Sequence, residues 1–91
     1  MLHDKIVKIK VYADPGHGWG AVKIRVLKEL GIADKITAYS YQKGATAYLE
    51  EDLDLPLLIE TLKRRAVFYR IEEKAHTNRY SPIRGYDRYQ A

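Results

Sequence analysis

The sequence predicts a single α+β domain, in which an antiparallel sheet is covered on one face by two helices. Segments with the two-residue period of a strand alternate along the chain with segments that have helical spacing. The 91 residues suffice for one modest hydrophobic core. Because the chain has no cysteine, disulfides and zinc–thiolate sites are excluded, and packing alone must hold this core together.

The first half of the domain begins with a strand. Apolar residues alternate with lysines and a tyrosine over residues 5–13, as in a half-buried strand. A glycine-rich turn follows, and apolar residues at helical spacing then predict a helix over residues 22–30 that ends at Gly31. The stretch GWGAVKI, residues 18–24, is also compatible with a short extra strand before a helix of one or two turns.

A hairpin and a second helix come next. Residues 35–41 and 45–51 are expected to pair around the turn at residues 42–44. The second helix is predicted from an apolar stripe, with Asp52 or Asp54 as its N-cap. The stripe consists of Leu55, Leu58, Ile59 and Leu62.

The last predicted strand covers residues 67–73 and completes a ferredoxin-like βαββαβ order over residues 1–73. One face of the sheet is then left uncovered. Residues 74–91 lose periodicity and form an irregular, tyrosine-rich tail that either packs on the domain or extends from it. This tail has four Lys/Arg and one Asp, so it contributes +3 of the net charge of +4.

The uncovered face and the tail combine basic and aromatic residues, which is typical of single-stranded nucleic-acid binding: bases stack on rings and cations meet phosphates. The candidate residues on the sheet are Lys8, Lys10, Tyr12, Tyr39 and Tyr41, with Tyr48 on the same face. The candidates in the tail are Arg79, Arg84, Tyr86 and Arg88.

Residues 5–73 resemble an RNA-recognition motif in topology and length. The segment KGATAYLEED, followed by an amphipathic helix, resembles the third strand of that family, and VLKELGIADKI resembles its first helix and the following strand. The resemblance implies nucleic-acid binding on the open face of the sheet. The chain departs from the family's aromatic signature, because Ala45, Thr46 and Ala47 follow Lys43-Gly44.

The turn DPGHGW, residues 14–19, resembles the opening motif of zinc-dependent N-acetylmuramoyl-L-alanine amidases. That resemblance implies zinc ligands at His17, Glu29 and His76, with one coordination position open for water. Without a metal, Asp14, His17 and His76 supply acid and base groups for a small hydrolase. The alternative is a structural turn that needs its glycines, with His17 bonding locally and no cofactor.

The combination ADPGHGW…LGIADKI…YSYQKG…AYLEEDLDL…HTN…IRGY is similar to a family of small uncharacterised bacteriophage and mobile-element proteins. The resemblance implies a viral origin and a binding role, with a host protein as the alternative partner to nucleic acid. We therefore expect a non-enzymatic binding protein, monomeric or homodimeric. A cytoplasmic location, in the bacterial host if phage-encoded, is expected because no apolar run reaches membrane-span length and MLHDKIVK carries no signal-peptide core.

Overall fold

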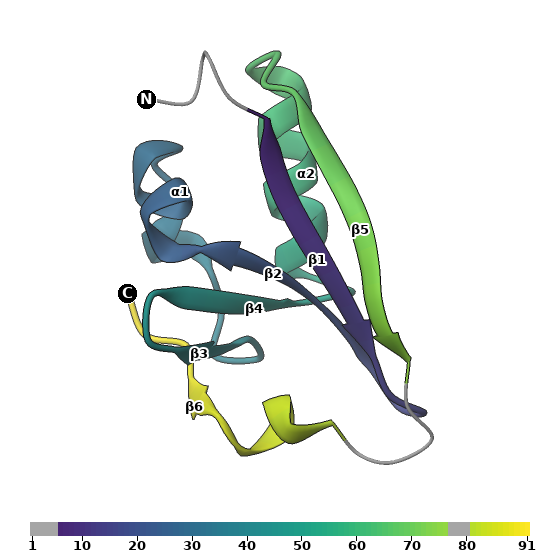
Figure 1. The fold of residues 1–91 in the computed structure, drawn as a ribbon. Helices are drawn as coiled ribbons and strands as arrows, with labels where there is room; N and C mark the ends of the chain where they lie inside the picture. Colours follow the sequence, from purple (N-terminus) through teal and green to yellow (C-terminus); the bar gives the residue numbers. More distant parts are fainter. Residues whose placement is uncertain (1–5, 77–80) are drawn as a thin grey trace.

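The computed structural model describes residues 6–76 and 81–91, with the backbone alone for residues 75 and 76. Six strands form one mixed sheet in the order β5-β1-β2-β4-β3-β6 (Figure 1). The strands are β1 Val7–Ala13, β2 Gly18–Lys23, β3 Tyr41–Lys43, β4 Thr46–Glu50, β5 Tyr69–His76 and β6 Asp87–Arg88. The helices are α1 Ile24–Glu29 and α2 Asp54–Arg64, with 3₁₀ turns at Ala33–Lys35 and Pro82–Gly85.

The α+β class is confirmed, whereas the ferredoxin-like order and the wholly antiparallel sheet are wrong. Strand β5 pairs parallel with β1, and β2 is an additional strand between β1 and β4. Gly20 explains why residues 18–23 form a strand: a Cβ atom there would lie 2.5 Å from Leu55 Cδ1 of α2. The backbone of β2 thus passes close beneath α2, and the first helix is confined to Ile24–Glu29.

The predicted strand over residues 35–41 is also wrong, because only its last residue belongs to β3. The Asp54 carboxylate binds this segment as a loop. It accepts hydrogen bonds from Thr37 N (3.1 and 3.2 Å), Thr37 Oγ1 (2.7 Å) and Ser40 Oγ (2.5 Å). These bonds hold the loop against the start of α2 and remove its backbone from the sheet.

Neither predicted N-cap of α2 is correct. Leu53 occupies the N-cap position and makes no side-chain capping bond. Glu50 performs the related task, since its Oε1 accepts hydrogen bonds from the backbone N–H groups of Asp52 and Leu53, both at 2.9 Å. The Asp54 side chain binds Thr37 and Ser40 of the loop instead.

The core lies between the sheet and both helices. Its buried members from the helices are Val26, Leu27, Leu58 and Leu62, and those from the strands are Val7, Ile9, Val22, Ala47 and Leu49. Strand β5 continues to His76, beyond its predicted end. None of the described helices is long and apolar enough to cross a membrane.

The tail is not irregular where the structure describes it. Residues 81–91 lie against the domain, and β6 adds an antiparallel strand beside β3. Tyr89 is 3% exposed and joins the core cluster; its hydroxyl donates to Ala33 O at 2.7 Å, and its backbone N–H donates to Ser40 O at 2.9 Å. An interior anchor thus fixes the end of the chain.

Candidate nucleic-acid interface

The glycine-rich turn after β1 is organised by the buried carboxylate of Asp14. Its Oδ1 accepts from Gly16 N and His17 N at 2.9 Å, and from Arg84 Nη2 at 3.0 Å. Its Oδ2 accepts from Arg84 Nε at 2.7 Å and from Ser81 N at 2.9 Å. The Arg84 guanidinium and the backbone donors hold the pKa of Asp14 well below its usual range, against the opposing effect of burial. Asp14 therefore shapes the turn and fastens the tail to it.

The structure also shows where the residues predicted for acid–base chemistry and zinc binding lie. The five bonds of Asp14 engage both of its oxygens. His17 is exposed beside Trp19, with ring centroids 6.1 Å apart. Glu29 ends α1, beyond the far end of β2, which separates it from His17 by roughly 17 Å of strand. His76 is opposite Ala13 in the sheet, and its side chain lies outside the described residues.

No group of three His, Cys, Asp or Glu side chains with the geometry to hold a metal occurs within the described part of the chain. The turn is accounted for by the Asp14 bonds alone.

The face of the sheet that points away from α2 is termed here the outer face. Directly opposed residues on neighbouring strands share a face, so the strand register defines it. Its residues are Lys8, Lys10, Tyr12, Trp19, Ala21, Lys23, Tyr41, Lys43, Thr46, Tyr48, Glu50, Arg70, Glu72 and Arg88. No described α-helix covers this face, and residues 81–91 run along the lower border of the sheet (Figure 1).

Three tyrosine rings form a row across the outer face. The centroids of Tyr12 and Tyr48 are 6.3 Å apart, and those of Tyr48 and Tyr86 are 5.1 Å apart. Lys43 Nζ lies 4.9 Å from the Tyr86 ring centroid. Burial raises the pKa of the Tyr48 hydroxyl, and Tyr86 and Tyr12 raise it further, so the ring stays neutral at physiological pH. All three rings are half-buried, which leaves part of each accessible.

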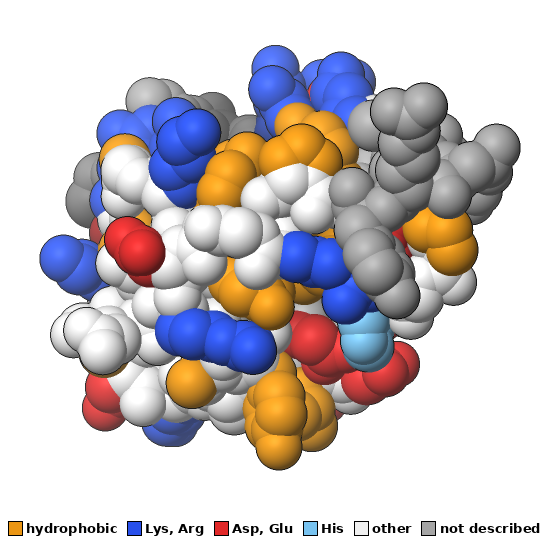
Figure 2. Space-filling model, turned by 90° about the horizontal axis from the view of Figure 1, so that it is seen from below, with side chains coloured by type: hydrophobic (Ala, Val, Ile, Leu, Met, Phe, Trp, Pro, Cys, Tyr) orange, Lys and Arg blue, Asp and Glu red, His pale blue; other side chains and the backbone are white. Residues whose placement is uncertain are grey.

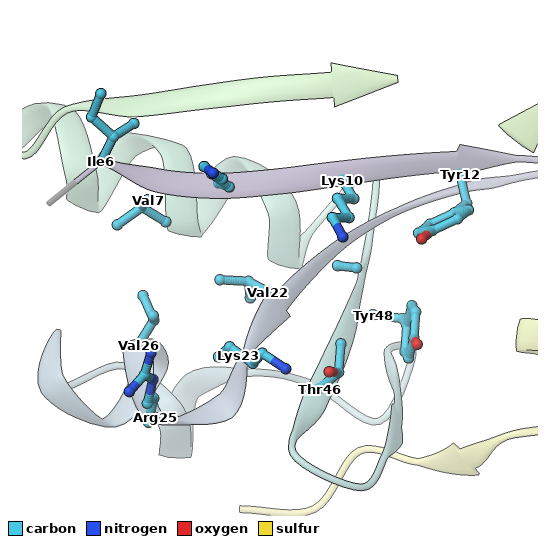
Figure 3. Close-up of a pocket in the computed structure, with 12 residues that line it drawn as sticks. Ile6, Val7, Lys10, Tyr12, Val22, Lys23, Arg25, Val26, Thr46 and Tyr48 are labelled. Carbon is cyan, nitrogen blue, oxygen red and sulfur yellow. The ribbon is translucent and has the colours of Figure 1, made fainter. Parts of the chain in front are cut away.

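A groove of about 410 Å³ adjoins this row, and we call it the basic groove (Figure 3). It opens because β2 pairs with β1 only from Lys10 onward, so the first half of β1 and the end of β2 diverge. Valines from β1, β2 and α1 line it: Val7, Val22 and Val26. Tyr12 and Tyr48 stand at one end, and Arg25 lies at the other (Figure 3).

The charged residues that line the basic groove are all basic. Lys8, Lys10, Lys23 and Arg25 line it, and no acidic residue does so among those that the structure describes. No ion pair joins any of these four cations to another described residue. Lys10 extends from β1 toward β2, and Lys23 extends from the end of β2 toward Thr46 (Figure 3). Four cations around an apolar floor favour an anionic ligand that also has an apolar surface.

A second hollow, of about 430 Å³, lies at the opposite end of the outer face, and its charge is mixed. It is lined by His17, Trp19, Tyr39, Tyr41, Glu50, Asp52, Leu53, Arg84 and Arg88. Figure 2 shows acidic, basic and histidine side chains close together on this end of the molecule. The carboxylates of Glu50 and Asp52 repel phosphate, so this mixed hollow suits a nucleic-acid backbone less well than the basic groove.

Arg84 and Arg88 serve largely to hold the tail in place. Besides binding Asp14, Arg84 has its guanidinium carbon 5.5 Å from the centroid of Trp19, which is 2% exposed. Arg88 donates to Ala38 O at 3.2 Å, and its guanidinium carbon lies 4.7 Å from the Tyr41 ring centroid. The outer face is consequently covered near Trp19 and open near Tyr48.

The binding residues predicted from the sequence lie in different places in the structure. Lys8, Lys10 and Tyr12 line the basic groove, and Tyr86 joins the tyrosine row. Tyr39 is in the turn before β3, 65% exposed and off the paired strands. Arg79 lies outside the described residues.

The sequence reasoning missed Lys23, Arg25 and Lys43. Lys23 alternates with Trp19 and Ala21, so treating residues 18–24 as a strand would have put it on the outer face. Arg25 is the second residue of α1, and its place depends on where that helix begins. Comparison with protein-family models, curated proteins and solved structures found no match to this chain.

Proposed function

We propose that this protein is a non-enzymatic binding module for single-stranded nucleic acid, and that the outer face is its binding surface. One observation carries the proposal: a groove whose four cations form no ion pair with another described residue, and whose described lining has no acidic residue, continues into a row of three tyrosines. The phosphates would contact the four cations of the groove, and the bases would stack on Tyr12 and Tyr48. A bacteriophage or mobile-element origin, as the sequence motifs suggest, is compatible with such a role.

Single strands fit this surface better than duplexes do. An aromatic side chain can stack only on a base whose own face is free, and in a duplex each base face is covered by its neighbours. The groove is also floored by valines, which gain nothing from contact with a continuous phosphate backbone. The proposal therefore includes a preference for unpaired bases.

The hydrolase alternative has less support from the geometry. An acid–base catalyst must exchange a proton near neutral pH, whereas hydrogen bonds from Arg84 and the backbone lower the pKa of Asp14. A host protein is the competing partner, and a nucleic-acid binding assay distinguishes a host-protein partner from a nucleic-acid partner.

The test is fluorescence anisotropy with labelled single-stranded DNA and RNA and with a duplex of the same sequence. Replacing Tyr48, the central ring of the row, by alanine should weaken single-strand binding about 5- to 100-fold, the range for one lost base–aromatic stack. Tyr39→Ala is the matched control, because Tyr39 is exposed and off the paired strands. Absence of saturable binding to any of these nucleic acids would reject the proposal and favour a protein partner, and equal losses in both variants would reject the assignment of the face.

A further inference from the structure

Strand β5 is one edge of the sheet, and no described strand pairs with its outer side (Figure 1). It is the longest strand of the protein, with 8 residues, so it presents a long row of backbone donors and acceptors. Two exposed large hydrophobic residues belong to it or adjoin it: Phe68 is 79% exposed and Ile71 is 46% exposed. An edge of this length with apolar residues is a site for pairing with another strand.

The charges of β5 determine which strand fits. Arg70, Glu72 and Lys74 follow one another at alternate positions, and Glu72 lies within 3.6 Å of Arg70 Nε and 3.5 Å of Lys74 Nζ. A second copy of β5, related by a two-fold axis perpendicular to the sheet, would pair antiparallel with the first. Opposed residues must then lie on the same face of the joined sheet.

Only one register satisfies these charges over the strand. Registers centred on Arg70, Glu72, Glu73 or Lys74 put like charges directly opposite each other, and those centred on Tyr69 or on residues 75 and 76 leave most of β5 unpaired. The register centred on Ile71 opposes Ile71 to its own copy, Arg70 to Glu72, and Phe68 to Lys74. Opposite charges then meet twice, and the exposed Ile71 side chains cover each other.

We propose that the protein forms a two-fold symmetric homodimer through antiparallel pairing of β5, with Ile71 at the axis. The axis keeps both outer faces on the same side of a continuous sheet. Two basic grooves would thus share one surface, and a single strand long enough to reach both would bind more tightly than a short one. The dimer itself does not depend on the proposed nucleic-acid binding, and it is tested without nucleic acid.

The experiment uses charge reversal in the full chain, with sedimentation velocity from about 10 µM to 1 mM as the readout. Arg70→Glu and Glu72→Arg each turn two attractive contacts into two repulsive ones, so each variant should dimerise about tenfold more weakly or worse. Mixing the two variants restores opposite charges at both contacts, and a heterodimer of wild-type strength should form. Lys35→Glu, an exposed charge reversal outside the sheet, is the control and should dimerise like the wild type.

Circular dichroism first establishes that each variant is folded. A wild-type protein that stays monomeric throughout this concentration range would overturn the proposal. Single variants that dimerise as strongly as the wild type would overturn it equally, since the contact would then lie elsewhere. Failure of the mixed variants to associate would reject the register. Loss of nucleic-acid binding with an intact dimer would instead reject only the proposed function.

Discussion

Neutralising Lys23 should reduce the salt dependence of single-strand binding by a defined amount. Each phosphate contact on a single strand contributes about −0.7 to the slope of log K against log salt concentration. With the four groove cations in contact, the expected slope is about −2.8, which means that affinity falls about 50-fold between about 50 and 200 mM salt. Removing one contact should change the slope to about −2.1.

The measurement is a series of anisotropy titrations at several salt concentrations with one single-stranded oligonucleotide. Lys23→Gln keeps the length and polarity of the side chain and removes only the charge. Lys63→Gln is the matched control, because Lys63 is an exposed lysine in the last turn of α2, away from the outer face. Both variants have the same net charge, so a contribution from overall charge affects them equally.

Two results would refute this reasoning. Identical slopes for the two variants would show that binding responds to net charge and not to the groove. A wild-type slope near zero would show that phosphates are not in contact with the four cations at all. A lower affinity of Lys23→Gln with an unchanged slope would indicate that the side chain acts by packing.

Three further changes test the framework around the groove. Asp14→Asn should loosen residues 81–85, seen as faster amide exchange there, while Tyr89 still holds the end of the chain. Folding lowers the pKa of Asp14, so the stability that this residue supplies is present above about pH 4 and is lost as the pH falls below that value. The difference between variant and wild type in urea unfolding should therefore shrink at acid pH. Asp54→Ala leaves buried donors without a partner and should lower the free energy of unfolding, measured with urea, by about 2–4 kcal/mol. Asp52 is exposed in the adjoining turn, so Asp52→Ala should change this free energy by no more than about 0.5 kcal/mol. Ala21→Met extends an outward-pointing side chain into the groove and should weaken single-strand binding without lowering stability, as measured by anisotropy and urea unfolding together.

The elements that sequence reasoning found are those with a clear local period. Alternation over residues 5–13 found β1, and the apolar stripe of α2 found that helix nearly to its ends. Strand β2 was offered only as an alternative, because residues 22–30 also satisfy helical spacing. The decisive fact is the close approach of α2 to Gly20, which depends on residues 35 positions further along the chain.

Contacts between distant segments explain the other misses. The loop at residues 36–40 has strand-like composition, but its backbone is captured by Asp54, 14 and 17 residues away. The tail is held by Asp14, which lies 67 residues before Ser81 and 70 before Arg84. No local pattern encodes such partners, so periodicity could not find them.

The buried Asp14 carboxylate also links this long-range packing to the proposed binding surface. Tyr12 and Tyr48 lie on strands of the sheet itself, but Tyr86 reaches the row only because residues 81–85 are fastened beside the turn. The glycine-rich turn thus contributes to binding without touching a ligand: it decides whether the outer face presents three rings or two. If that is so, Asp14→Asn and Tyr86→Ala should weaken single-strand binding to the same extent, and the double variant should be no weaker than either, because both remove the same ring from the row.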